Sequence, residues 1–109
     1  MLIFQWDDEN KDHIALHDVT PVEAKEVVHG AVQPYAMDLG GGKWLVRGMT
    51  AAGRFLQVIY VYRPVETIDL DTIDPEDRLF VLDEEEVAYV IHARDLTEKE
   101  RRSARKRRR

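Results

Sequence analysis

Cysteine is absent from this sequence, and no long apolar run occurs in it. Without cysteine there is neither a disulfide nor a thiolate metal site, which suits a cytoplasmic protein. No stretch approaches the roughly 20 apolar residues of a transmembrane helix, and none resembles the apolar part of a signal peptide. Apolar residues make up 44% of the 109 positions, enough for one modest core. We therefore expect a single cytoplasmic domain without membrane contact.

Basic residues are scarce in most of the chain and concentrated at its end. Residues 98–109 carry eight Lys or Arg residues against two Glu, although the whole chain has a net charge of −5. Residues 66–86 carry ten acidic residues and only Arg78 of opposite sign. The sequence thus predicts a main domain over residues 1–97, followed by a basic helix or tail at 98–109.

Local signals predict an α+β fold. Thr20, Pro21 and Glu23 form a capping box that opens a helix, and Thr97 with Glu100 forms a second one. Apolar patterns and turn residues delimit the other elements. The predicted strands are 2–6, 32–38, 43–49, 54–62 and 87–93, and the predicted helices are 8–17, 21–29 and the segment from residue 98. We expect an antiparallel sheet of about four strands with two N-terminal helices and a C-terminal helix.

Two segments, FQWDDENKDHIALHDVTPVEAKEVV and GRFLQVIYVYR with AYVIHARDLTEKERR, resemble the BrnT family of toxins. BrnT toxins are small ribonucleases of bacterial type II toxin–antitoxin pairs and are related in fold to RelE. The resemblance covers most of the chain. The matching residues are Phe4, Trp6, Asp7, Asn10, His17, Val19, Glu23, Ala24, Val27, Gly53, Arg54, Tyr60, Ala93, Arg94, Thr97, Glu100, Arg101 and Arg102.

The resemblance implies a RelE-like fold and an endoribonuclease toxin that inhibits translation. RNA, either free or as ribosome-bound mRNA, would be its substrate, and a cognate antitoxin protein would neutralise it. Operator DNA would be bound only through the antitoxin, and self-association stays open. The family joins its last two strands by a tight turn, so residues 64–86 are predicted to be an acidic insertion. We expect this insertion to protrude from the core, with a short strand around 78–82.

RNA cleavage needs no metal, because the neighbouring 2′-hydroxyl can attack the phosphate if protons are moved and charge is stabilised. His17 is the candidate for proton transfer, and Arg47 and Arg94 are the candidates for holding the phosphate. Each has a structural alternative: His17 could interact with the dipole of the preceding helix, and each arginine could pair with an acidic side chain. The residues further predicted to bind RNA are Arg54, Tyr60, Arg101, Arg102 and Arg105.

Three positions depart from the family pattern. Leu16 stands where the family has Lys, Asp18 where it has Gly, and Asp95 where it has a basic residue. Each change removes positive charge or adds negative charge, which disfavours a polyanionic substrate. A catalytically weakened protein–protein interaction module is therefore the alternative. A third hypothesis is a nucleic-acid-binding accessory protein that uses the tail from Arg101 to Arg109, which could equally be a solvated terminus.

Metal sites are weakly indicated. His13 and His17 are spaced like zinc ligands on a helix, but no third ligand follows from the spacing. The segment from Asp69 to Asp71 has Asp74 and Phe80 where a calcium loop needs Gly and Glu. We expect neither a metal nor a cofactor.

Overall fold

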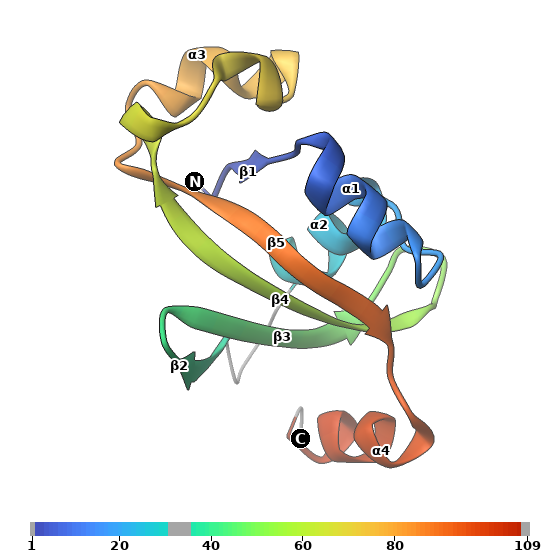
Figure 1. Ribbon diagram of the computed structural model, residues 1–109. Coiled ribbons are helices and arrows are strands. Elements are labelled where there is room, and N and C mark those ends of the chain that lie inside the picture. The colour runs from blue at the N-terminus through green and yellow to red at the C-terminus, as the bar shows by residue number, and fades with distance from the viewer. Residues whose placement is uncertain (1, 31–35, 108–109) are drawn as a thin grey trace.

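A mixed sheet organises the described residues of the computed structural model, which are 2–30 and 36–107, with side chains described as far as residue 103. Over these residues the strand order is β1-β5-β4-β3-β2 (Figure 1). The strands are β1 (Phe4–Gln5), β2 (Met37–Gly40), β3 (Lys43–Met49), β4 (Phe55–Pro64) and β5 (Glu86–Asp95). The expected α+β class is confirmed. The predicted antiparallel sheet of about four strands is only partly right, because β1 adds a fifth strand that pairs in parallel with β5.

The pairing of β1 explains why the sheet is mixed. The amide of Ala88 donates to the carbonyl of Ile3, at 2.8 Å, and Phe4 lies opposite Ala88 in the register. On its other side β1 meets the acidic insertion, where the amide of Trp6 donates to the carbonyl of Thr72 at 2.8 Å. The remaining neighbours in the sheet pair antiparallel. The first strand is therefore held between two segments that follow it by more than sixty residues.

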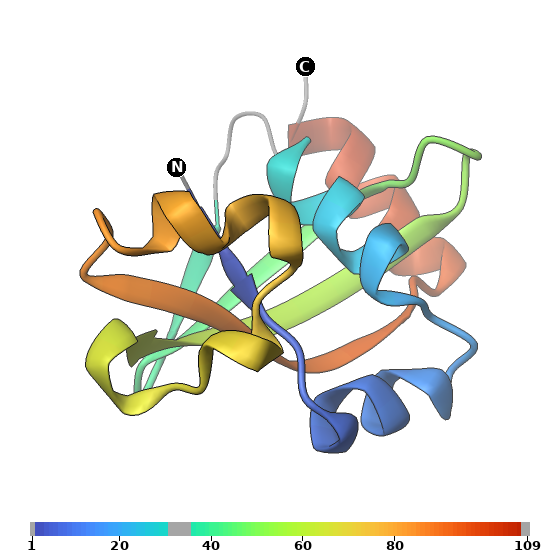
Figure 2. The ribbon, with the colours of Figure 1, turned by 90° about the horizontal axis from the view of Figure 1, so that it is seen from above.

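The helices lie on both sides of the sheet. Helices α1 (Asp8–Ala15) and α2 (Pro21–His29) cover one face, and α4 (Glu98–Arg107) lies on the opposite side (Figures 1 and 2). The predicted capping box of Thr20 and Glu23 is present, and α2 has its predicted bounds. Helix α1 ends two residues before its predicted end. None of the described helices is long and apolar enough to cross a membrane.

Strand alternation divides the sheet into an apolar and a polar face. Val46, Val58 and Ala93 are cross-strand neighbours on β3, β4 and β5, and all three belong to the core beneath α1 and α2. Helix residues such as Ile14 and Val27 are buried in the same cluster. Because successive side chains of a strand point to opposite faces, the next residue on each strand points away from this core.

Several residues of the N-terminal segment that match BrnT make contacts that stabilise the fold. The side chains of Asp7 and Asn10 form a capping box at the start of α1, and the amide group of Asn10 donates to the carbonyl of Gln5 at 3.1 Å. The hydroxyl of Tyr89 donates to the carboxylate of Asp7 at 2.9 Å, which ties α1 to β5. Trp6 is buried in the core. These matching residues are thus explained by structure without any role in chemistry.

The acidic insertion does not simply protrude, and the strand predicted around 78–82 is wrong. It consists of three short 3₁₀ turns and the one-turn helix α3 (Arg78–Val81). Ile73 and Val81, only 1% and 0% exposed, form a second core cluster with Ile3 and Val87. These two buried side chains anchor the turn-rich segment, which packs over the end of the sheet. The insertion is therefore an integral part of the domain.

Candidate functional site

A row of three polar side chains crosses the face of the sheet opposite α1 and α2. Arg47 on β3 lies opposite Gln57 on β4, and Gln57 lies opposite Arg94 on β5. The Nε of Arg47 donates to the Oε1 of Gln57 at 3.2 Å. The structure thus brings together the two arginines predicted to hold a phosphate. Gln57, which was not predicted as a site residue, lies between them on β4.

Helix α4 places the carboxylate of Glu100 between these arginines. Arg94 donates through Nη1 and Nη2 to Oε1 and Oε2 of Glu100 at 2.8 and 2.9 Å, and Nη2 of Arg47 donates to Oε2 at 3.1 Å. The predicted capping box of Thr97 and Glu100 is also present, because the Thr97 amide donates to Oε1 at 2.9 Å. The hydrogen bonds from Arg94, followed by that from Thr97, hold the pKa of Glu100 far below its usual range. The guanidiniums of Arg94 and Arg47 and the amide of Thr97 thus surround one carboxylate and form a compact anion site.

Histidines adjoin this row along β5. His92 precedes Arg94 by two residues on the strand, and its ring lies 5.5 Å from that of His17 in an edge-to-face contact. The ring of His13 on α1 is 6.3 Å from that of His92. Burial lowers the pKa of His92, and its neighbours His17, Arg94 and His13 lower it further. A lowered pKa favours the neutral imidazole, which is the form that accepts a proton.

His92 was not predicted as a site residue. Its only signal in the sequence was its place two residues before Arg94 in a predicted strand, which puts both side chains on one face. Its contact with His17 depends on how α1 docks against β5, and no local pattern encodes that docking.

Arg54 was predicted to bind RNA, but its donors are occupied within the protein. Nε and Nη2 donate to the two carboxylate oxygens of Asp95 at 2.8 and 3.0 Å, and Nη1 contacts Glu23 at 3.3 Å. The same guanidinium donates to the backbone carbonyls of His17 and Asp18. The hydrogen bond from Arg54 lowers the pKa of Asp95. Arg54 therefore fixes the loop that carries His17, and the carboxylate of Asp95 compensates the positive charge of Arg54.

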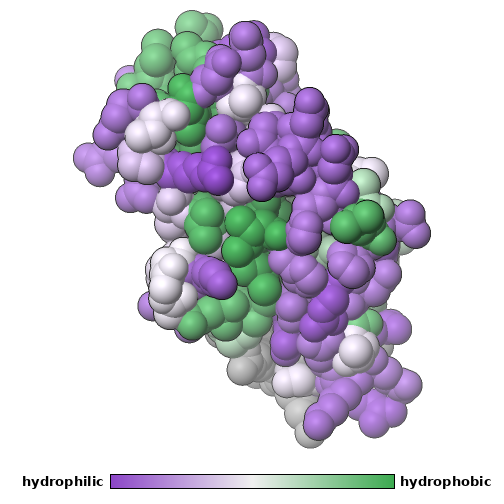
Figure 3. All heavy atoms as spheres, viewed as in Figure 1, coloured by the Kyte–Doolittle hydropathy of each residue, from purple (hydrophilic) through white to green (hydrophobic). Residues whose placement is uncertain are grey.

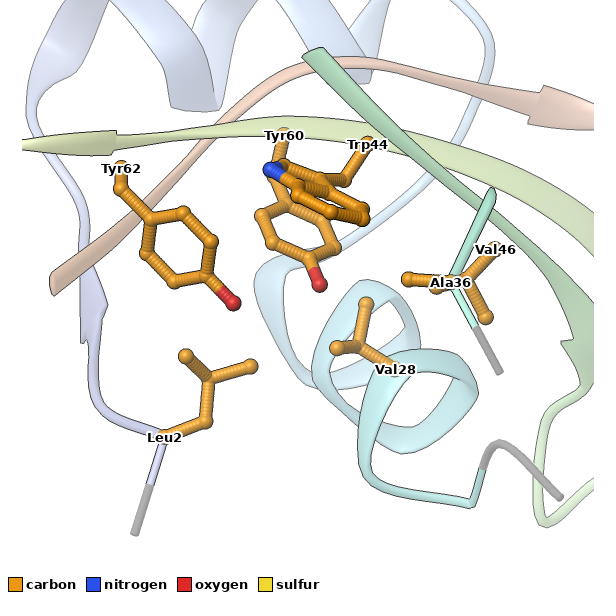
Figure 4. Close-up of a pocket in the computed structure, with 7 residues that line it drawn as sticks. All are labelled: Leu2, Val28, Ala36, Trp44, Val46, Tyr60 and Tyr62. Atoms are coloured by element: carbon orange, nitrogen blue, oxygen red, sulfur yellow. The ribbon is translucent and has the colours of Figure 1, made fainter. Parts of the chain in front are cut away.

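Tyr60 was also predicted to bind RNA, but it lies on the other face of the sheet. Alternation along β4 puts it on the core side, where it is 3% exposed, and burial raises the pKa of its hydroxyl. Tyr60 lines a pocket of about 330 Å³ with Trp44, Tyr62 and Val28 among its other walls (Figure 4). Its ring is thus separated by the sheet from the row of arginines.

The other predicted RNA-binding residues belong to α4. The guanidinium of Arg101 lies 4.5 Å from the centre of the Phe55 ring, and its buried Nε has no hydrogen-bond partner among the described residues. Arg102 forms an exposed pair with Glu98 at 2.8 Å. Arg105 lies in α4, but its side chain is outside the described part of the chain.

The structure shows the local surroundings of two residues that depart from the BrnT pattern. Leu16 is 78% exposed, so the position tolerates either an apolar or a charged side chain. Asp18 has φ of 56°, a left-handed conformation that favours the glycine of the family. Within the described residues, no three His, Cys, Asp or Glu side chains are grouped closely enough to hold a metal ion.

Comparisons with known proteins give no relative for this chain. No protein-family model, no curated protein and no solved structure matches it. Membership of the BrnT family and a RelE-like fold therefore stay predictions based on the matching residues. The geometry of the row and of the histidines beside it is what points to a function.

Proposed function

We propose that this protein is a metal-independent endoribonuclease toxin of a type II toxin–antitoxin system. The supporting observation is the convergence of Arg47 and Arg94 on a single anion, with His92 two residues before Arg94 on β5. The ring of His17, in the turn that follows α1, contacts that of His92. Two guanidinium groups can hold a phosphodiester and stabilise the charge that develops on it. Imidazoles supply proton transfer near neutral pH. These are the groups that RNA cleavage by its own 2′-hydroxyl needs.

In the proposed reaction the imidazoles move protons and the arginines hold the phosphate. A neutral imidazole, for which His92 is suited by its lowered pKa, takes the proton from the 2′-hydroxyl. The 2′-oxygen then bonds to phosphorus, and the bond to the 5′-oxygen breaks. The leaving 5′-oxygen receives a proton from the second imidazole, His17. The products are a 2′,3′-cyclic phosphate and a 5′-hydroxyl.

The proposal extends to the partners that the resemblance implies. The substrate would be RNA, either free or as mRNA on the ribosome, and cleavage in the cytoplasm would inhibit translation. A cognate antitoxin would cover the row of Arg47, Gln57 and Arg94. Operator DNA would be bound through the antitoxin alone.

A second candidate is a non-catalytic interaction module that keeps this fold. The observation that favours it is the pairing of the arginines with acidic side chains, since Arg47 and Arg94 contact Glu100 and Arg54 contacts Asp95. Such pairs are common on sheet surfaces and need no ligand. This candidate predicts that the chain binds a protein partner and leaves RNA intact.

The experiment expresses the chain alone and maps the ends of cellular RNA. We expect slowed growth and 2′,3′-cyclic or 3′-phosphate ends. Arg47→Ala or Arg94→Ala should lower the cleavage rate about 10²–10³-fold, the usual effect of losing one group that stabilises the developing charge. Lys11→Ala, which removes an exposed cation of α1, is the matched control and should cleave like the wild type.

Circular dichroism and thermal unfolding should show that each variant stays folded. If both arginine variants cleave like the wild type, the site is elsewhere. If the wild-type chain leaves RNA intact while it still binds a partner, the interaction module is the correct function.

A further inference from the structure

The site proposed to hold phosphate is already filled by an anion of the same chain. Glu100 receives two hydrogen bonds from Arg94, one from Arg47 and one from the amide of Thr97. A carboxylate and a phosphodiester both accept paired hydrogen bonds from a guanidinium. Because the two guanidiniums meet on one carboxylate, a phosphate can occupy this position only after Glu100 has left it.

The attachment of α4 to the sheet is polar and small. The helix residues, EKERRSARKR, include no large apolar side chain. Besides Glu100, its described contact with the sheet is the guanidinium of Arg101 over the ring of Phe55. The Nε of Arg101 is buried without a hydrogen-bond partner among the described residues, which makes the docked position costly.

The charged contacts are also open to solvent. The side chains of Arg47, Arg94 and Glu100 are 24%, 30% and 18% exposed. The pairing of Arg94 with Glu100 is bidentate, but ion pairs that solvent reaches weaken as salt is added. The docked helix is therefore held by the kind of contact that a polyanion can replace.

We propose that Glu100 is an internal occupant of the oxyanion site and that α4 leaves the sheet when an RNA phosphodiester binds there. The choice of RNA as ligand rests on the proposed function. Docked and released α4 are two states, and RNA binds the released one. The apparent affinity for RNA is then lower than the intrinsic affinity by the fraction of molecules in which α4 is released. Any partner that binds α4 in its released position would raise RNA affinity by the same linkage.

The test compares Glu100→Gln with Glu98→Gln. Both variants remove one negative charge from α4, but Glu98 contacts only the exposed Arg102 in the described residues. The ligand is a 2′-O-methyl RNA oligonucleotide, which cannot be cleaved because its 2′-oxygen is blocked, so that binding is measured apart from chemistry by fluorescence anisotropy. We expect Glu100→Gln to bind about tenfold more tightly than the wild type, since the docked state is lost. Glu98→Gln should differ from the wild type by less than about twofold.

Two further measurements complete the test. The double variant Arg47→Ala/Glu100→Gln should lose the gain, because the guanidinium that receives the phosphate is absent. In the wild-type chain, amide hydrogen exchange of residues 100–103 should become faster when the oligonucleotide is added, because a released helix of 10 residues is only marginally stable in water. This second readout requires no variant and would not change if Glu100 had only a structural role.

Equal binding by Glu100→Gln and the wild type would overturn the proposal, as would an equal gain in Glu98→Gln. Continued protection of α4 in the presence of bound oligonucleotide would do so too, and so would the absence of binding in every variant. Cleavage of unmodified RNA decides the proposed function separately. If Glu100→Gln binds more tightly and unmodified RNA stays intact, the role of Glu100 as internal occupant is supported and the ribonuclease function is wrong. If the wild type and Glu100→Gln both cleave RNA and bind it equally, the ribonuclease function is supported and the role of Glu100 as internal occupant is wrong.

Discussion

Asp18 has a backbone conformation that glycine would adopt more easily. Among the described residues it is the one non-glycine residue with a left-handed φ, and the carbonyl of this residue accepts a hydrogen bond from Arg54. A side chain at such a position costs up to about 1–2 kcal/mol, although Asp and Asn tolerate it better than most. The strain is therefore located in the loop that presents His17.

We expect Asp18→Gly to raise the free energy of unfolding by up to about 1 kcal/mol, because glycine adopts this conformation without strain. Urea denaturation measures the change. Asp12→Gly, an exposed position within α1, is the matched control and should lower the free energy by about 0.5–1 kcal/mol. A loss of stability in both variants would show that Asp18 is not strained.

The lowered pKa of His92 makes a prediction about pH. The unfolded chain takes up a proton at this residue as the pH falls below about 6.5, whereas the folded chain does so only at lower pH. The unfolded state thus binds more protons in this window, and the free energy of unfolding decreases as the pH falls. His92→Gln should remove this contribution and flatten the decrease.

Denaturation curves at several pH values between 5 and 8 measure the slopes. The comparison is made between the variant and the wild type, since His29, whose pKa is also lowered by burial, contributes equally to both. Identical slopes would mean that folding does not affect protonation of His92.

At the scale of elements, the acidic insertion combines a buried and an exposed side. Ile73 and Val81 are buried, whereas Leu79 and Phe80 on α3 are 81% and 54% exposed. Figure 3 shows hydrophobic side chains over this region, next to hydrophilic ones. The salt bridge between Lys25 and Asp74, at 2.7 Å, further attaches the insertion to α2.

Ile73→Ala should lower the free energy of unfolding by about 2–5 kcal/mol, because it leaves a cavity in the second core cluster. Leu79→Ala, which removes an exposed apolar side chain from the same insertion, should change it by less than about 0.5 kcal/mol. Thermal or urea unfolding of the two variants measures both values. A small effect of Ile73→Ala would show that the insertion contributes little to the stability of the fold.

Helices with caps could be predicted from the sequence, whereas long-range pairings could not. Thr20 with Glu23 and Thr97 with Glu100 act over three residues, so their boxes are visible in the chain itself. The parallel partner of β1 lies more than eighty residues away, and nothing local selects it. The one-turn helix at 78–81 was mistaken for a strand because the short apolar run from Leu79 to Leu82 fits either structure.

The candidate site divides in the same way. Arg47 and Arg94 were each named from the sequence as candidates to hold the phosphate. That they share a face follows from the pairing of β3 and β5 with β4, which includes a register shift at Ile59 and Tyr60. The capping role of Glu100 was predicted, but its bridge to both arginines depends on the direction in which α4 leaves β5. Tyr60 was misjudged because an aromatic residue in a strand fits a core as well as a nucleic-acid surface.

At the scale of the whole molecule, opposite charges lie at opposite ends. The acidic insertion with α3 and the basic helix α4 stand at the two ends of β5 (Figure 1). The longest dimension of the molecule is 39 Å. Electrostatic screening at physiological salt acts over about 8 Å, so the two ends do not stabilise one another directly. The molecule instead carries a permanent charge asymmetry that can orient it towards a polyanion.

The position of β5 between β1 and β4 also sets the order in which the fold can form. β5 lies between β1 and β4, and it is complete only when the residues up to Asp95 have been synthesised. Until then β1 lacks its neighbouring strand and can meet only the segment around Thr72 and Ile73, and the hairpin of β3 and β4 leaves an unpaired edge. Contacts between residues so far apart in the chain form late and slowly. During translation the anion site therefore cannot exist before its last strand and α4 emerge, and the two appear almost together.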